Sequence, residues 1–104
     1  VDVLLAQHSA LLIPTTLGTA PKFTAFADGA VWTAMRTMPF NMSGHPAISL
    51  PCGFGANGLP LGCQLVGGFG QEALLCRLAY QLEQSSNHSA RPAIGAEPVS
   101  LDYP

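Results

Sequence analysis

The sequence has little charge. Only 10% of its 104 residues are charged, whereas a soluble domain usually carries about 25%. The four Lys and Arg residues are scattered, and the formal net charge is −2. The chain therefore has no basic patch that could neutralise phosphates. This excludes nucleic acid and anionic membrane surfaces as expected partners.

Long apolar runs are also missing. No run approaches the roughly 20 residues that span a bilayer, and the first residues lack the basic segment that opens a signal peptide. The three cysteines, Cys52, Cys63 and Cys76, are an odd number and form no C-x-x-C pair. That usage favours reduced thiols in a cytosolic protein. We therefore expect a cytoplasmic location without membrane contact.

Apolar residues, in contrast, are abundant and make up 48% of the chain. A small domain has a high surface-to-volume ratio and needs polar groups to cover that surface. The chain also begins with Val1. We therefore expect its exterior to be buried in part against another protein surface, or the chain to be a section of a larger polypeptide. The same apolar exterior would also suit the interface of a homodimer.

The first third of the chain alternates short elements with breakers. A continuous apolar run that Pro14 stops is typical of a strand buried on both faces. Trp32, Met35 and Met38 lie three residues apart, which indicates a helix with one apolar side. The expected elements are a helix end at 1–7, a strand at 10–13, a loop at 15–30 and a helix at 31–38.

A short helix with signals at both ends follows within residues 37–46. Thr37 can cap it, and Pro39 is tolerated in the first turn, where its missing N–H is not needed. Gly44 can take the left-handed conformation that ends a helix, and Pro46 prevents its continuation.

The pair Asn57-Gly58 lies between two apolar runs, at 47–54 and 59–67, and predicts a β-hairpin. A two-residue loop would place Cys52 opposite Cys63. Each of the two strand prolines removes a hydrogen-bond donor, so each is expected at a bulge, a strand end or an edge. These prolines are Pro51 and Pro60.

The last periodic segment, residues 71–84, predicts an amphipathic helix. Its apolar stripe consists of Leu74, Leu75, Leu78, Ala79 and Leu82. Residues 85–104 are polar and contain prolines, which indicates a surface tail. The chain thus divides into a folded region at 1–84 and a tail at 85–104.

Sequence motifs that would indicate catalysis, cofactor binding or metal binding are weak. Gly68-x-Gly70-x-x-Ala73 opens the last helix as a dinucleotide-binding turn would, yet no acidic residue follows about 20 positions on to hold a ribose. Ser43 stands outside a G-x-S-x-G elbow, and His45 is interpreted as a loop histidine. The histidines and cysteines lack metal-ligand spacing. We expect no catalytic residue, cofactor or metal in the chain itself.

Four segments nevertheless resemble the C-terminal part of the amidase signature family. They are residues 39–54 (PFNMSGHPAISLPCGF), 57–67 (NGLPLGCQLVG), 72–75 (EALL), and 10–16 (ALLIPTT) with Ala20-Pro21. The resemblance implies an α/β fold, namely a section of an α/β/α sandwich with a mixed sheet. It also implies hydrolysis of amide C–N bonds by a serine, a second serine in a cis peptide and a lysine. Those residues belong to segments that precede this region in the family, so none is carried over here.

The resemblance further implies a substrate pocket for a small amide near the short helix. Its candidate lining is Trp32, Met35, Phe40, Asn41 and Met42. Asn41 could act through a hydrogen bond, or simply tie the short helix to the hairpin. Family members that take ammonia from glutamine tend to have an acidic residue seven positions before this asparagine. Ala34 stands there instead, which argues against the tRNA-dependent amidotransferase branch and favours an apolar amide.

Two functions therefore stay open. In the first, the chain is part of an amidase, and the missing N-terminal part of the same polypeptide supplies the reacting groups. In the second, it is a non-catalytic binding or interaction module derived from an amidase C-terminus. If the chain is part of an amidase, the isolated chain is expected to fold poorly or aggregate, because strands that pack inside a larger sandwich would expose their apolar side chains to water.

Overall fold

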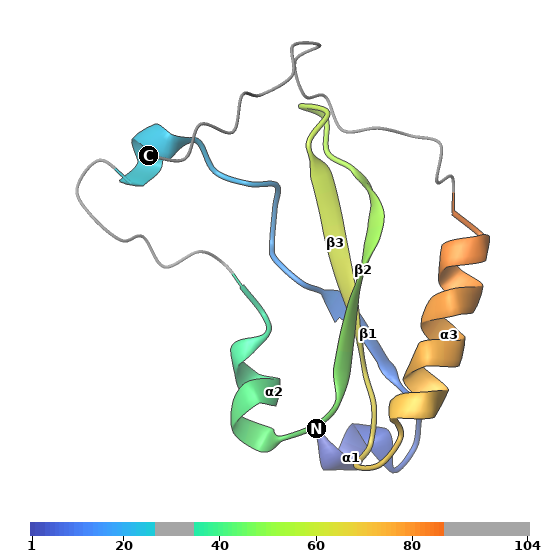
Figure 1. Ribbon diagram of the computed structural model, residues 1–104. Helices are drawn as coiled ribbons and strands as arrows, with labels where there is room; N and C mark the ends of the chain where they lie inside the picture. Colours follow the sequence, from blue (N-terminus) through green and yellow to red (C-terminus); the bar gives the residue numbers. More distant parts are fainter. Residues whose placement is uncertain (27–34, 87–104) are drawn as a thin grey trace, which may run out of the picture.

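The computed structural model describes residues 1–26 and 35–86. Figure 1 shows a small twisted sheet with helices on either side of it. The elements are α1 (Asp2–Leu5), β1 (Leu11–Pro14), the 3-10 turn η1 (Phe23–Phe26), α2 (Met38–Ser43), β2 (Ala47–Phe54), β3 (Pro60–Val66) and α3 (Glu72–Gln84). This arrangement confirms the predicted α/β class. Residues 31–34 of the predicted helix at 31–38, and residues 87–104 of the predicted tail, lie outside the described residues.

The sheet has β3 in the centre, and both neighbouring strands run antiparallel to it. Leu65 of β3 lies opposite Leu12 of β1 and Ile48 of β2. Because side chains alternate along a strand, residues next to Leu65, such as Gln64, point to the other face. The described strand pairs are all antiparallel, so β1 and β2 run in the same direction without pairing.

One face of the sheet carries the apolar core. Leu65 packs with Leu75 and Ala79 of α3, and the three are between 2% and 6% exposed. Partly buried hydrophobic residues surround this cluster: Ala10, Ile48, Leu50, Leu78 and Leu82. The helix stripe predicted from the 3.6-residue period is thus confirmed for Leu75, Leu78, Ala79 and Leu82, whereas Leu74 is not part of the cluster.

The first strand differs from its prediction. We expected it to be buried on both faces, yet Leu12 is 58% exposed. Leu12 is exposed because β1 lies at the edge of the sheet, whereas α3 packs over the other two strands, β2 and β3. Within the described residues, the apolar side chain of Leu12 is left uncovered.

The other face is crossed by the segment that leads into α2. Met35 forms an isolated antiparallel bridge with Thr16, and the Arg36 N–H donates to the Thr15 carbonyl at 2.8 Å. Residues 35–37 are therefore not helical, which corrects that part of the predicted helix at 31–38. Backbone pairing with the end of β1 replaces the helix there. Figure 1 shows α2 on the opposite side of the sheet from α3.

Helix α2 begins and ends where the sequence signals place it. Thr37 is the N-cap residue by position, but its side chain makes no capping hydrogen bond; Pro39 lies in the first turn, and Gly44 ends the helix with φ +80°. A left-handed backbone of this kind favours glycine because it has no Cβ to clash. The Gly44 N–H donates to the Phe40 carbonyl at 2.9 Å, and this turn redirects the chain into β2.

The hairpin forms as predicted, but with a different register. Its connection spans residues 55–59, and Leu50, rather than Cys52, lies opposite Cys63. The register shifts between Pro51 and Gly53, so Cys52 is the extra residue of a β-bulge. The prolines meet the expectation: Pro51 borders the bulge and Pro60 is the first residue of β3.

Candidate functional site

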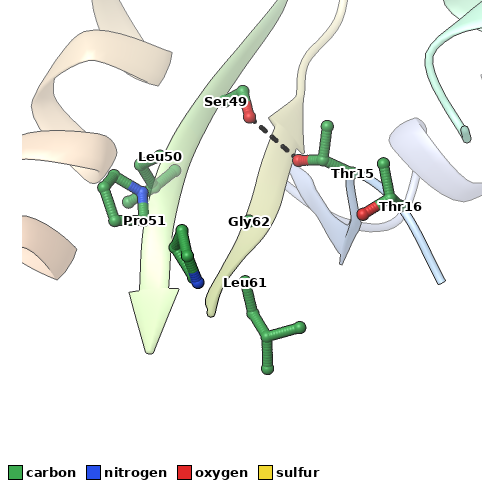
Figure 2. A pocket seen from close by; sticks show the side chains of 8 residues that line it. Thr15, Thr16, Ser49, Leu50, Pro51, Leu61 and Gly62 are labelled. Atoms are coloured by element: carbon green, nitrogen blue, oxygen red, sulfur yellow. Dashed lines mark hydrogen bonds between the residues drawn. The ribbon is translucent and has the colours of Figure 1, made fainter. Parts of the chain in front are cut away.

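A shallow pocket of about 420 Å³ opens beside the hairpin. Its lining comes from the end of β1, the middle of β2 and the start of β3, as Figure 2 shows. The lining residues are Thr15, Thr16, Ser49, Leu50, Pro51, Pro60, Leu61 and Gly62. The hairpin strands β2 and β3 thus meet the end of β1, which is distant in sequence, on one small surface.

Two hydroxyl groups form the polar part of this pocket. Thr15 Oγ1 and Ser49 Oγ lie 2.9 Å apart, and Ser49 Oγ donates to the Cys63 carbonyl at 3.3 Å. With the Ser49 proton used in that bond, Thr15 donates to Ser49. The oxygen of Thr15 can then accept a hydrogen bond from an N–H group of a ligand.

Gly62 keeps the space beneath the hydroxyl pair open. A Cβ at this position would lie 3.4 Å from Thr15 Oγ1 and 3.8 Å from Ser49 Oγ. The first of these separations is at the tight end of ordinary contact. A side chain at residue 62 would therefore press on the hydroxyls and fill the pocket floor.

The lining is neutral and mostly apolar. None of its eight residues is ionisable, and two prolines and two leucines form much of the wall. A serine or threonine needs an adjacent base to become a nucleophile, and this lining has none. The pocket can therefore hold a neutral polar ligand, but these residues cannot perform acyl transfer by themselves.

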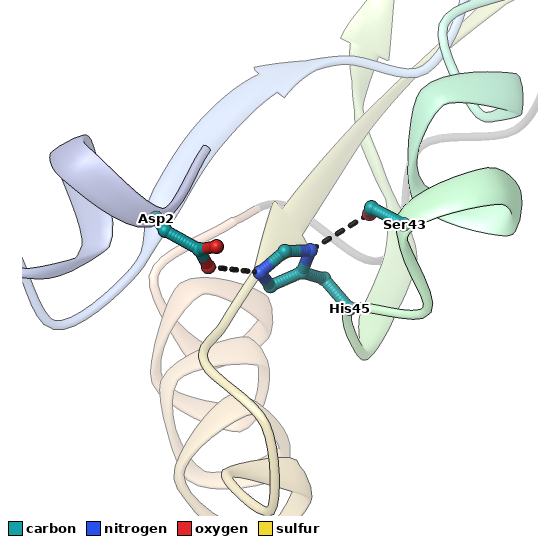
Figure 3. Close-up of polar contacts among 3 residues, drawn as sticks. All are labelled: Asp2, Ser43 and His45. Atoms are coloured by element: carbon teal, nitrogen blue, oxygen red, sulfur yellow. Dashed lines mark hydrogen bonds and ion pairs between the residues drawn. The ribbon is translucent and has the colours of Figure 1, made fainter.

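A second polar cluster lies at the other end of the sheet, around His45 (Figure 3). His45 Nε2 lies 2.8 Å from Asp2 Oδ1, and His45 Nδ1 lies 2.7 Å from Ser43 Oγ. Because a carboxylate only accepts hydrogen bonds, Nε2 is the donor to Asp2. The ring is 7% exposed and stacks on Phe69 with centroids 4.4 Å apart.

This cluster contains the residue types of a hydrolase triad, but its surroundings indicate a structural role, in which its contacts hold neighbouring elements together. The Asp2 side chain is 81% exposed, whereas the carboxylate that orients a catalytic histidine is usually buried. The contacts join α1, the end of α2 and the turn before α3. No local pattern predicts them, because Asp2 lies 43 residues from its partner.

The structure places the five residues predicted to line a substrate pocket as follows. Met35 is 53% exposed and forms a backbone bridge with Thr16. Thr16 belongs to the pocket that contains the Thr15–Ser49 hydroxyl pair, here called the hydroxyl pocket, so Met35 lies at its rim. Phe40 is buried within α2, and Asn41 and Met42 are exposed on it. Trp32 lies outside the described residues. The residues that line the hydroxyl pocket include none of these five, and the substrate-binding role of the five stays a prediction.

Thr15 and Ser49 lie in segments that carry the family resemblance, but they were missed because neither stands in a catalytic or ligand-binding motif. Ser49 stands between two apolar residues, Ile48 and Leu50, and this alternation places it on the face opposite α3. That pattern is the one signal in the sequence that could have drawn attention to it. Their proximity depends on the β1–β3–β2 strand order, which the sequence alone does not fix.

Among the described residues, no three His, Cys, Asp or Glu side chains gather as metal ligands would. Within the same ranges, no helix is long and apolar enough to cross a membrane. Within residues 1–26 and 35–86, one titratable group is clearly perturbed: burial raises the pKa of the Cys63 thiol, and the neighbouring Cys52 thiol adds to this effect by charge repulsion and hydrogen bonding.

Comparison with known proteins finds related chains over most of this sequence. The model of the amidase family matches residues 1–76. A glutamyl-tRNA(Gln) amidotransferase subunit of Synechococcus sp. (strain CC9311) is 44% identical over 94 residues, which cover 88% of this chain and 19% of that protein. The subunit of the same name from Bacillus cereus (strain AH187) is 38% identical over 91 residues, 85% of this chain and 19% of that protein. The chain thus spans about a fifth of the length of these relatives.

A solved structure has a similar fold. The 6-aminohexanoate cyclic dimer hydrolase superimposes with a TM-score of 0.71 and 33% sequence identity. The match covers 88% of this chain and 22% of the hydrolase. The described sheet and helices therefore correspond to a section of a much larger fold.

Proposed function

Because the chain belongs to the amidase family, we propose that it forms part of an amidase that hydrolyses C–N bonds of a small, apolar amide. In this proposal the rest of the same polypeptide supplies the serine, the cis-peptide serine and the lysine. The present chain contributes substrate binding. The enzyme works in the cytoplasm without a cofactor, and its uncovered apolar surface leaves a homodimer open.

The observation that carries this proposal is the neutral pocket between the three strands. Its hydroxyl pair offers an acceptor to an amide N–H, and its walls of leucine and proline suit an apolar substituent. A charged substrate would lose hydration without gaining a charged partner among the lining residues. Met35 at the rim, together with Trp32, Phe40, Asn41 and Met42, completes the proposed substrate-binding region.

Ammonia transfer from glutamine is a second candidate, favoured by the 44% identity to an amidotransferase subunit. Two observations argue for the hydrolase instead. Ala34 replaces the acidic residue that glutamine-using members tend to have, and the lining of the hydroxyl pocket has no charge to meet the zwitterion of glutamine. A non-catalytic module is the remaining alternative.

Steady-state kinetics on the polypeptide that carries this chain test the proposal. We expect turnover of neutral aliphatic or aryl amides and at least tenfold lower kcat/KM with glutamine. Thr15→Val removes the acceptor while keeping the shape, and we expect KM to rise about 2–10-fold, the equivalent of one hydrogen bond. The kcat should stay within about twofold, because the interaction binds substrate and transition state alike.

The matched control is Ser9→Ala, at an exposed position between α1 and β1, which should leave both constants unchanged. Preference for glutamine would support the amidotransferase candidate. Absence of turnover in the whole polypeptide would support the non-catalytic module. An unchanged KM in Thr15→Val would remove the hydroxyl pocket from the substrate site.

A further inference from the structure

The β-bulge in the hairpin brings two cysteines together. Leu50 lies opposite Cys63, and Cys52 follows Leu50 by two residues. Pro51 pairs with Gly62, so Cys52 and Cys63 flank this pair on neighbouring strands, and the Cys52 thiol is close enough to raise the pKa of the Cys63 thiol. Both cysteines are free in the structure.

The two thiols differ in access. Cys52 is exposed on an edge strand, whereas Cys63 is half-buried in the central strand. Next to Cys52, Gly53 has φ +133° and no atoms within 4 Å of the place where a Cβ would be. The backbone therefore has room to adjust at the bulge, which matters because a disulfide requires Cα atoms about 4.4–6.8 Å apart.

We propose that Cys52 and Cys63 form a redox modification site, closing to a reversible disulfide across the β2–β3 bulge. The oxidant we name is a small disulfide such as oxidised glutathione. The thiolate of Cys52 attacks one of its sulfurs, which forms a mixed disulfide and releases one glutathione thiolate. The thiolate of Cys63 then attacks the Cys52 sulfur and releases the second. Two protein thiols are oxidised and one glutathione disulfide is reduced to two thiols.

The order of attack follows from the structure. Cys52 reacts first because it is exposed, and Cys63 resolves the mixed disulfide because it is adjacent. The raised pKa of Cys63 makes its attack slow at neutral pH and faster at alkaline pH. In a reducing cytoplasm the pair stays as two thiols, which agrees with the expectation of reduced cysteines, and it closes when oxidised glutathione rises.

The site also borders the hydroxyl pocket. Pro51, which lines the pocket, is adjacent to Cys52, and Gly62, which also lines it, is adjacent to Cys63. A covalent link across the bulge fixes this edge of the pocket. The inference does not depend on the proposed amidase activity, because it concerns thiol chemistry alone.

Peptide mapping after equilibration in glutathione buffers tests this proposal. The polypeptide that carries this chain is incubated under native conditions, alkylated and digested. Trypsin leaves all three cysteines between Arg36 and Arg77, so chymotrypsin is added to cut after Phe54, between Cys52 and Cys63. We expect a linked pair of peptides, two hydrogens lighter than the reduced pair, as the main oxidised product.

Three variants give the controls. Cys76→Ser removes the exposed thiol of α3 and should leave the linked product unchanged. Cys63→Ser should retain the mixed disulfide on Cys52, and Cys52→Ser should lose at least tenfold of all oxidation at this site. Unfolding in urea should slow formation of the link at least tenfold, because the fold no longer holds the thiols together. Far-UV circular dichroism checks that each variant keeps its secondary structure.

Two results would overturn the proposal. One is a stable mixed disulfide on Cys52 with Cys63 still free in the native wild-type protein. The other is a link that forms equally fast in the unfolded protein, or that joins Cys76 instead. In either case the bulge would have no role in oxidation.

Discussion

The two faces of the sheet are held in different ways. On the α3 face, Leu65 packs against Leu75 and Ala79, and apolar contact alone fills the space. On the opposite face, Gln64 is only 2% exposed, and its Nε2 donates to the Arg36 carbonyl at 2.8 Å. The first face holds a helix on the sheet. The second holds a crossing segment in place by hydrogen bonds and carries the hydroxyl pocket.

This difference shows where stability and function divide. Apolar packing is tolerant of detail and anchors the fold, whereas buried polar groups must find specific partners. The polar face is therefore the face on which side chains are held in positions defined narrowly enough to bind a ligand. Three changes, taken from the largest expected effect to the smallest, test the comparison.

Replacing Leu75 by alanine should be the most destabilising change. The side chain is 2% exposed at the centre of the α3 core, and such a truncation costs about 2–5 kcal/mol. Urea denaturation of the polypeptide that carries this chain, followed by circular dichroism, measures the free energy of unfolding. The neighbouring Leu74→Ala is the control because Leu74 is only half-buried. Equal losses from the two variants would contradict the placement of the core.

Replacing Gln64 by methionine should cost less. Methionine fills a similar volume but cannot donate to the Arg36 carbonyl, so about 1 kcal/mol of one hydrogen bond is lost. The same denaturation experiment measures it, with exposed Gln81→Met expected within about 0.5 kcal/mol of wild type. A Gln64→Met protein as stable as wild type would show that the polar face does not hold the crossing segment.

The smallest effect concerns the cysteine on the apolar face. Burial and Cys52 raise the pKa of Cys63 above its ordinary value of 9.0. Between the ordinary and the raised pKa, the unfolded chain loses the thiol proton while the folded chain keeps it. The unfolded state then binds fewer protons, so stability falls as pH rises through this window and is unaffected below it. Chemical denaturation of reduced protein from pH 8 upward should show this slope, and it should be weaker in Cys63→Ser.

The elements with local signals could be predicted from the sequence. Pro39 and Gly44 bound α2, the Asn57-Gly58 turn predicts the hairpin, and the leucine stripe predicts α3. In each case the signal lies within a few residues, so the element is predicted, although the register of the hairpin is not.

The features that the sequence does not predict depend on contacts between separate segments of the chain. The Thr15–Ser49 hydroxyl pair joins residues 34 positions apart, and the Asp2–His45 contact joins residues 43 apart. The bulge at Cys52 depends on how a five-residue connection sets the register. Met35 pairs with Thr16 rather than continuing a helix, because the end of β1 offers it backbone partners. None of these has a local pattern.

Several large apolar side chains of the described region are also exposed to solvent. Leu12 is 58% exposed, Leu17 60% and Phe23 95%. Leu12 lies on β1, the edge strand beside the strands that α3 covers, and Leu17 and Phe23 follow β1 in the chain. Such exposure is expected where a further layer of a larger domain covers the surface, in agreement with the 22% coverage of the similar hydrolase.

The most direct test of the central claim, that this sheet is a section of a larger amidase fold, is thermal unfolding of the 104-residue chain expressed by itself. Calorimetry is combined with sedimentation to give the transition and the association state together. The account predicts self-association and a broad transition or none, because the surface around β1 is uncovered. A monomer with one sharp, reversible transition would contradict it.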